Sequence, residues 1–185
     1  MTRYGSYEQL ANRFSYLRMN DLAQNPIKVF REDSPSLRRI DIVYGRGSAR
    51  LWLFDVLQAT FGFLGVMNDR FSKEQIIDLA GTIVASPKFG SLKIGEFVLF
   101  LSRFKSGAYG RFYGSDSYAL VVMGALHKFW DERTEFYQKI DEEDRKREEQ
   151  ESKRNAVTFK EWKAMKESKG EKVNLTDDEV ESIIG

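Results

Sequence analysis

Apolar residues recur at helical spacing along most of this chain. The first apolar stripe has a spacing of three or four positions and consists of Tyr7, Leu10, Phe14 and Leu17. This spacing predicts an amphipathic helix that begins near Ser6. No pair of strands joined by an Asn-Gly or Asp-Gly turn is evident. The pattern therefore predicts an all-α protein.

Capping and turn residues divide the apolar pattern into successive helices. Side chains that accept hydrogen bonds from the free amides of a first turn mark the expected starts, which are Asn25, Ser34, Ser48 and Ser72. The start at Ser72 is a capping box, because Gln75 follows three positions later. A further helix is expected over residues 93–106, where Gly107 ends it. Leu51 is expected on the buried face of the helix that follows Ser48.

A very long helix is predicted from Asp116 onward, with Leu120 on its apolar face. Between residues 141 and 154 every position except Gln150 and Ser152 is charged. If this stretch stays helical, the element has ~38 residues and a length of ~57 Å at 1.5 Å per residue. We therefore predict a compact multi-helix core domain over residues 1–140. A charged helical extension and tail, with short capped segments at Thr158 and Thr176, covers residues 141–185.

Composition narrows the chemistry available to the protein. The 185 residues are 42% hydrophobic and 14% aromatic, which is enough for a packed core. The absence of cysteine excludes a disulfide scaffold, a thiolate zinc site and a cysteine nucleophile. His127 is the single histidine, so no imidazole pair is available for a metal. We predict no catalytic residue, no metal and no cofactor.

An enzyme is the third interpretation in order of support. No nucleotide-binding, zinc-protease or nucleophile-elbow motif occurs in the sequence. A two-metal acidic site would require carboxylates of the core to converge in one cleft, and the candidates are Asp41, Asp55, Asp78 and Glu96. No segment has the apolar length of a signal peptide or a membrane span. We expect a cytoplasmic protein that does not contact a membrane.

Residues 102–115 form the most informative segment for function. They interleave three cations with four aromatic residues and three glycines between two predicted helices. Cations bind phosphates, and exposed aromatic rings stack on unpaired bases. The candidate nucleic-acid contacts are Arg103, Lys105, Tyr109, Arg111, Phe112 and Tyr113. In the alternative interpretation the aromatic rings are buried under the loop and the cations are simply solvated.

A second, weaker candidate is the glycine-rich turn over residues 44–50. Free amides at a helix N-terminus favour an anion, and Arg46 and Arg50 flank this turn. Both segments that hold these candidate contacts carry a net positive charge. Residues 1–50 hold nine Lys and Arg against five Asp and Glu, and residues 88–115 hold five against one. The rest of the chain is net acidic. The formal net charge of +1 is therefore the sum of two basic segments and an acidic remainder.

The same region resembles an uncharacterised family whose members occur in phages and mobile elements of gut bacteria. The resemblance rests on LKIGEF at residues 92–97, on Phe100, and on RFKSG.YGRFYGSD at residues 103–116. It extends over about residues 50–140 and includes WDER at 130–133. The family's own function is unsettled, so the resemblance implies a setting in mobile DNA rather than an activity.

Together these features predict a non-enzymatic accessory protein of phage or mobile-element DNA replication, located in the host cytoplasm. It would bind DNA, with single strands favoured, through the candidate contacts above. Residues 141–185 would dock a replication protein, such as a helicase or its loader, or another copy of the chain. The alternative is a helical adapter or structural protein that binds only other proteins through its long helix and tail.

Overall fold

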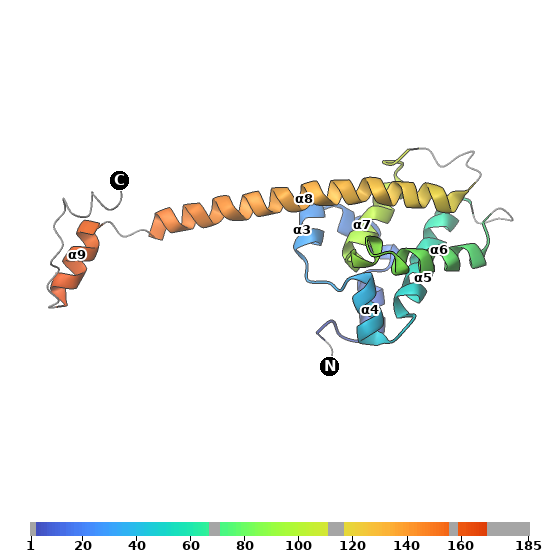
Figure 1. Ribbon diagram of the computed structural model, residues 1–185, viewed down its shortest axis with the longest axis horizontal. Helices are drawn as coiled ribbons and strands as arrows, with labels where there is room; N and C mark the ends of the chain where they lie inside the picture. The colour runs from blue at the N-terminus through green and yellow to red at the C-terminus, as the bar shows by residue number, and fades with distance from the viewer. Residues whose placement is uncertain (1–2, 67–70, 111–116, 156–158, 170–185) are drawn as a thin grey trace. The chain divides into compact units, whose positions relative to one another are not determined.

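The computed structural model describes residues 3–66, 71–110, 117–155 and 159–169. It confirms the all-α prediction (Figure 1). Within the described residues there is no strand, only an isolated bridge between Ser36 and Lys93. The elements are α1 (Tyr7–Arg13), the 3-10 turn η1 (Tyr16–Arg18), α2 (Met19–Ala23), α3 (Pro26–Arg31), α4 (Leu37–Tyr44), α5 (Ser48–Phe63), α6 (Lys73–Ala85), the 3-10 turn η2 (Phe89–Ser91), α7 (Ile94–Lys105), α8 (Tyr118–Asn155) and α9 (Phe159–Ser168).

The chain divides into two units, Met1–Gln138 and Lys139–Gly185. Helix α8 has 38 residues and contributes to both units. In the second unit its charged side chains pair along the helix, for example Lys146 with Glu142 at 2.8 Å. The charge run of the sequence is thus a solvated helical segment with i,i+4 pairs. None of the helices in the described ranges combines the length and the apolar character that crossing a membrane requires.

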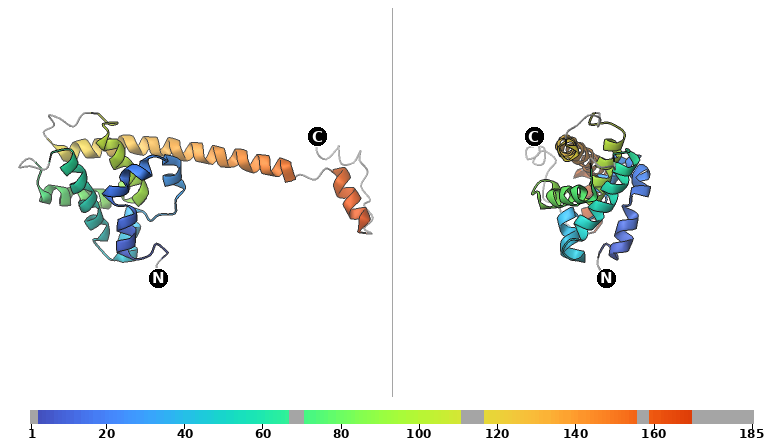
Figure 2. Two further views of the ribbon diagram at one scale, coloured as in Figure 1. Left: turned by 180° about the vertical axis from the view of Figure 1, so that it is seen from behind. Right: turned by 90° about the vertical axis from the view of Figure 1, so that its right-hand side faces the viewer.

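Helix α7 is the centre of the first unit. It packs against α2, α3 and α5 (Figure 2). The side chain of its Glu96 accepts a hydrogen bond from Arg133 of α8. Its residues from Ile94 to Leu101 and Phe104 are buried, whereas Ser102, Arg103 and Lys105 are partly exposed. Most of the surface of this helix is therefore covered by other parts of the unit. Phe100 lies in the middle of its aromatic residues, with ring centroids 5.4 Å from Phe97 and 5.6 Å from Phe129. At Gly95 an added Cβ would lie 3.2 Å from Phe14, so a small residue allows close packing there.

The capping predictions hold at three helix starts and are wrong at two. Ser6, Asn25 and Ser72 cap α1, α3 and α6 as expected. Helix α4 is capped by Ser36 instead of Ser34, with the Ser36 hydroxyl accepting from the Arg39 amide at 3.3 Å. Helix α5 is preceded by Gly47 at a φ of +93°, and the Ser48 hydroxyl donates to the Tyr44 carbonyl instead. The predicted caps Asp116, Thr158 and Thr176 lie outside the described residues.

Candidate nucleic-acid interface

Arg103 and Tyr109, two of the predicted contacts, are engaged by the same carboxylate. The Arg103 guanidinium forms an ion pair with Glu132 of α8. The Tyr109 hydroxyl donates to the same Glu132 oxygen at 3.1 Å, and the Tyr109 ring stacks on Phe100 with centroids 5.8 Å apart. Both side chains therefore hold the end of α7 and the following turn against α8. For Tyr109 the structure agrees with the alternative interpretation, in which the ring packs under the loop.

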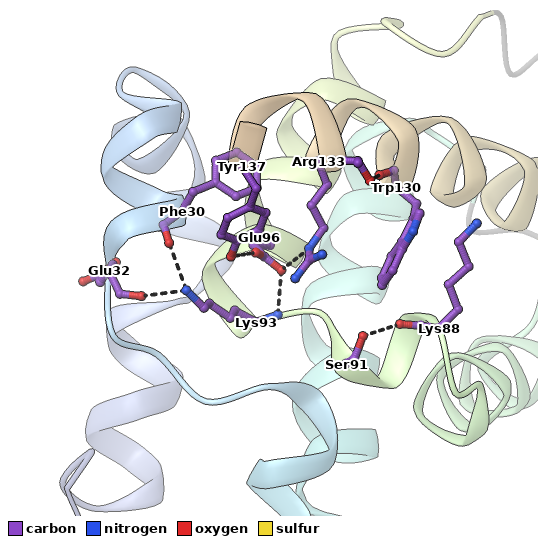
Figure 3. Close-up of polar contacts among 10 residues, drawn as sticks. Phe30, Glu32, Lys88, Ser91, Lys93, Glu96, Trp130, Arg133 and Tyr137 are labelled. Carbon is purple, nitrogen blue, oxygen red and sulfur yellow. Dashed lines mark hydrogen bonds and ion pairs between the residues drawn. The ribbon is translucent and has the colours of Figure 1, made fainter. Parts of the chain in front are cut away.

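A second set of contacts between α7 and α8 surrounds Glu96, which is completely buried (Figure 3). Its carboxylate accepts from the Tyr137 hydroxyl at 2.6 Å, from Arg133 Nε at 3.0 Å and from the Lys93 amide at 2.9 Å. The Arg133 guanidinium lies 4.8 Å from the Trp130 ring and 4.7 Å from the Tyr137 ring. The buried charge is thus paired and hydrogen-bonded on both oxygens, as burial of a carboxylate requires.

Lys93 extends this arrangement to α3. Its ammonium donates to the Phe30 carbonyl at 2.9 Å and lies 5.7 Å from the Tyr137 ring (Figure 3). Phe30 in turn stacks on Phe136 of α8 with centroids 4.9 Å apart. We call the polar contacts that α7 and the turn after it make with α8 the α7–α8 ion-pair network. Its members are Glu96, Arg103, Tyr109, Glu132, Arg133 and Tyr137. The network joins the segment around residues 92–109 to the segment around residues 130–137.

Burial raises the pKa of Tyr109 and of Tyr137, and the adjacent carboxylates Glu132 and Glu96 raise each further. Above about pH 10 the unfolded chain loses these phenol protons while the folded protein keeps them. We therefore expect the stability contributed by these protons to be complete below pH 10 and to fall as the pH rises. In denaturant titrations at increasing alkaline pH, the Tyr109→Phe, Tyr137→Phe double variant should lose stability less steeply than the wild type. Equal slopes would contradict this prediction.

Lys105 lies in a different environment, at the C-terminal end of α7. Its ammonium is 3.3 Å from the Asn20 side-chain oxygen, 5.0 Å from the Tyr16 ring centroid and 4.9 Å from the Phe63 ring centroid. Phe63 is 63% exposed although it is a large apolar side chain. We call Tyr16, Phe63 and Lys105 the cation–aromatic patch. The sequence pattern indicated Lys105 but not its two aromatic partners.

Arg46 and Arg50, the contacts predicted in the glycine-rich turn, are not brought together with Lys105. Arg46 is exposed in the turn before α5. Arg50 is directed toward α6, where it donates to the Ile77 carbonyl at 3.0 Å and pairs with Asp78 at 3.5 Å. Arg50 lies in the first turn of α5 and Phe63 is the last residue of this helix, so about 20 Å of helix separates them. The remaining predicted contacts, Arg111, Phe112 and Tyr113, lie outside the described residues.

Three of the four carboxylates considered for an acidic metal site have separate partners. Asp41 accepts from the Ala49 amide at 2.8 Å, Asp78 pairs with Arg50, and Glu96 pairs with Arg133. Across the described part of the chain, no group of three or more Asp, Glu or His side chains has the arrangement to hold a metal ion.

A scan against protein-family models matches residues 54–173 to a family of unknown function, DUF6633. The chain belongs to the DUF6633 family. The prediction of an uncharacterised family is thereby confirmed. No curated protein and no solved structure matches the chain.

The DUF6633 region begins within α5 and ends beyond α9. It extends past residue 140, where the resemblance seen in the sequence ended. Every member of the α7–α8 ion-pair network lies inside it, as do Phe63 and Lys105, whereas Tyr16 lies in the N-terminal segment outside it. Much of the sequence that carried the resemblance thus serves to fasten α7 to α8.

Proposed function

We propose that this member of the DUF6633 family is a non-enzymatic accessory protein of phage or mobile-element DNA replication that binds single-stranded nucleic acid. The observation that carries the proposal is the cation–aromatic patch, in which the exposed Phe63 ring has an ammonium group 4.9 Å from its centroid. An exposed ring offers a face on which any base can stack, and a neighbouring cation attracts the phosphate of the same nucleotide.

The charge of the first unit supports this proposal. Residues 1–138 hold 18 Lys and Arg against 14 Asp and Glu, a net charge of +4, whereas residues 139–185 hold 11 against 14. A positive body attracts a polyanion and speeds its association. The acidic second unit would be repelled by the same polyanion. We therefore assign it to contact with a replication protein or a second copy of the chain, in the cytoplasm of the host cell.

The proposed contact surface differs from the one inferred from the sequence. Arg103 and Tyr109 are removed from it, because their polar groups are bound to Glu132. Lys105 remains, and Tyr16 and Phe63 join it. The proposal therefore depends on two aromatic rings and a cation from three separate elements, η1, α5 and α7.

The proposal is tested by titrating a labelled single-stranded oligonucleotide at two salt concentrations. The wild type should bind more weakly at the higher salt. Phe63→Ala should weaken binding about 5- to 150-fold, because loss of a base stack costs about 1–3 kcal/mol. Lys105→Glu should weaken binding and reduce its salt dependence. Leu120→Ala is the matched control, since Leu120 is 73% exposed on α8 and lies outside the patch. Unchanged binding by both patch variants would refute the proposal.

A protein-binding adapter is the second candidate, and one observation favours it. Leu120 borders a cleft of about 350 Å³ between α6 and the start of α8, lined on its apolar side by Phe71, Leu79, Tyr118 and Met123. Exposed apolar surface beside a cleft is typical of protein contact sites. The titration above separates the candidates, because an adapter that binds only proteins would not bind the oligonucleotide at either salt concentration.

A further inference from the structure

A second cleft, of about 220 Å³, lies among the N-terminal helices next to the cation–aromatic patch. Its charged and polar lining residues are Arg13, Arg18, Asp21, Asn25, Lys28 and Glu32. The volume is below the range of about 300–1,000 Å³ that drug-sized ligands occupy. The cleft therefore has the size for a small group rather than for a whole nucleotide or cofactor.

The charges of this cleft are only partly neutralised within the protein. Arg13 forms an ion pair with Glu32. Within the residues that the structure describes, neither Arg18 nor Lys28 has an ion pair or a side-chain hydrogen bond. Asp21 is the remaining acidic group at the cleft. The lining therefore has a net charge of +1, with a guanidinium fork and an ammonium group available to an incoming anion.

The cleft and the patch are neighbours through η1. Tyr16 belongs to the patch and Arg18 lines the cleft, and both are residues of the same three-residue 3-10 turn. At 2.0 Å per residue, the two positions are separated by about 4 Å along the turn. A flexible single strand that stacks a base on Phe63 could continue across this turn toward Arg18 and Lys28.

We infer that this cleft binds a backbone phosphate of the single strand whose base stacks on Phe63. The inference rests on the proposed function. A phosphate diester has one negative charge, which complements the net charge of the lining. Arg18 provides two parallel donors for its oxygens, and Lys28 provides a point charge. The negative charge of Asp21 would repel a second phosphate in the same cleft.

The test uses the Arg18→Glu, Lys28→Glu double variant of the full chain and a labelled oligothymidylate. We expect binding to weaken about tenfold or more, the cost of losing a hydrogen bond to a charged group. The slope of log affinity against log salt should fall by about 0.7, the contribution of one phosphate on a single strand. The matched control is Arg39→Glu with Lys73→Glu, which makes the same change in charge on α4 and α6, away from the cleft lining. This control should keep the wild-type slope.

Three outcomes would overturn the inference, and each has a distinct meaning. If the wild type binds no oligonucleotide at either salt concentration, the proposed function fails and the cleft inference fails with it. If Phe63→Ala weakens binding but the double variant keeps the wild-type affinity and slope, only the cleft inference fails. Calorimetric titration with inorganic phosphate provides the third arm. If the double variant loses phosphate binding but keeps its oligonucleotide affinity, the cleft serves a free phosphate instead of a strand.

A milder variant separates binding from folding. Arg18→Gln with Lys28→Gln removes both charges without introducing acidic groups, and both side chains are exposed, so the fold should tolerate it. It should reduce the salt slope by the same amount as the glutamate pair. Circular dichroism and thermal unfolding of each variant provide the control for structure.

Discussion

Arg133→Leu should lower the free energy of unfolding by about 3–5 kcal/mol, the usual cost of removing one partner from a buried ion pair. The substitution keeps apolar volume between Trp130 and Tyr137 but leaves the Glu96 carboxylate with two of its three hydrogen-bond donors. Glu96 has no exposed surface, so water cannot replace the guanidinium without opening the contact between α7 and α8. Urea unfolding at neutral pH, followed by circular dichroism, measures the loss.

Two further variants identify the cause of that loss. Glu96→Leu combined with Arg133→Leu should recover much of the stability, because the double variant leaves no unpaired charge in the core. Arg103→Leu removes the other ion pair of the network, and it should cost only about 1 kcal/mol because both partners are partly exposed. Equal losses for Arg133→Leu and Arg103→Leu would show that burial of Glu96 does not determine the energetics.

Phe100→Ala should destabilise the protein by about 3–5 kcal/mol, the usual cost of removing a fully buried phenyl ring. The Phe100 ring contacts aromatic neighbours from α7, from the following turn and from α8, so its loss leaves a cavity that several elements line. Thermal or urea unfolding again provides the measurement.

Phe63→Ala is the matched control, because the same atoms are removed from an exposed site. It should change stability by about 0.5 kcal/mol or less, as substitutions at exposed positions usually do. The proposed function expects this variant to bind the oligonucleotide more weakly while keeping its fold. A large stability loss for Phe63→Ala, or a small one for Phe100→Ala, would contradict the assignment of these two rings to patch and core.

Helix starts were predictable where one residue alone could cap the helix, and the start of α4 was predicted wrongly because two serines close together both fitted. Ser72 had no competitor and was predicted correctly. Ser34 and Ser36 both fit the capping pattern beside Pro35, and tertiary contacts decided between them. The Leu37 amide donates to the Leu92 carbonyl at 2.9 Å, and the Ile94 amide donates to the Pro35 carbonyl at 2.9 Å. These bonds hold residues 35–37 against the segment before α7, so α4 begins only after them.

Apolar spacing also left the choice of buried face open in helices with many apolar residues. Leu51 and Leu120 fit the predicted stripes, yet both are exposed, because Trp52 in α5 and Val122 in α8 belong to the faces that are buried. For the same reason the exposure of Phe63 could not be predicted. An apolar residue in an apolar helix is normally taken for core, so its exposure could not be read from the pattern.

The partners of the candidate contacts could not be predicted from the sequence, because they lie far away along the chain. Arg103 and Tyr109 were singled out for their chemistry, but Glu132 follows them by more than twenty positions and no local pattern links the three. One signal was available. Glu96 is an isolated charge within an otherwise apolar run of α7, which indicates a buried pair with a cation elsewhere in the chain.

The position of Arg133 and Tyr137 within α8 limits where this chain can be shortened. Glu96 precedes them by 37 and 41 residues, so its charge remains uncompensated until that part of α8 has been synthesised and has docked on α7. Pairing at this separation requires the intervening chain to close into a loop before the contact can form. The first half of α8 is therefore an integral part of the globular domain, and a truncated chain that folds must extend at least through Tyr137.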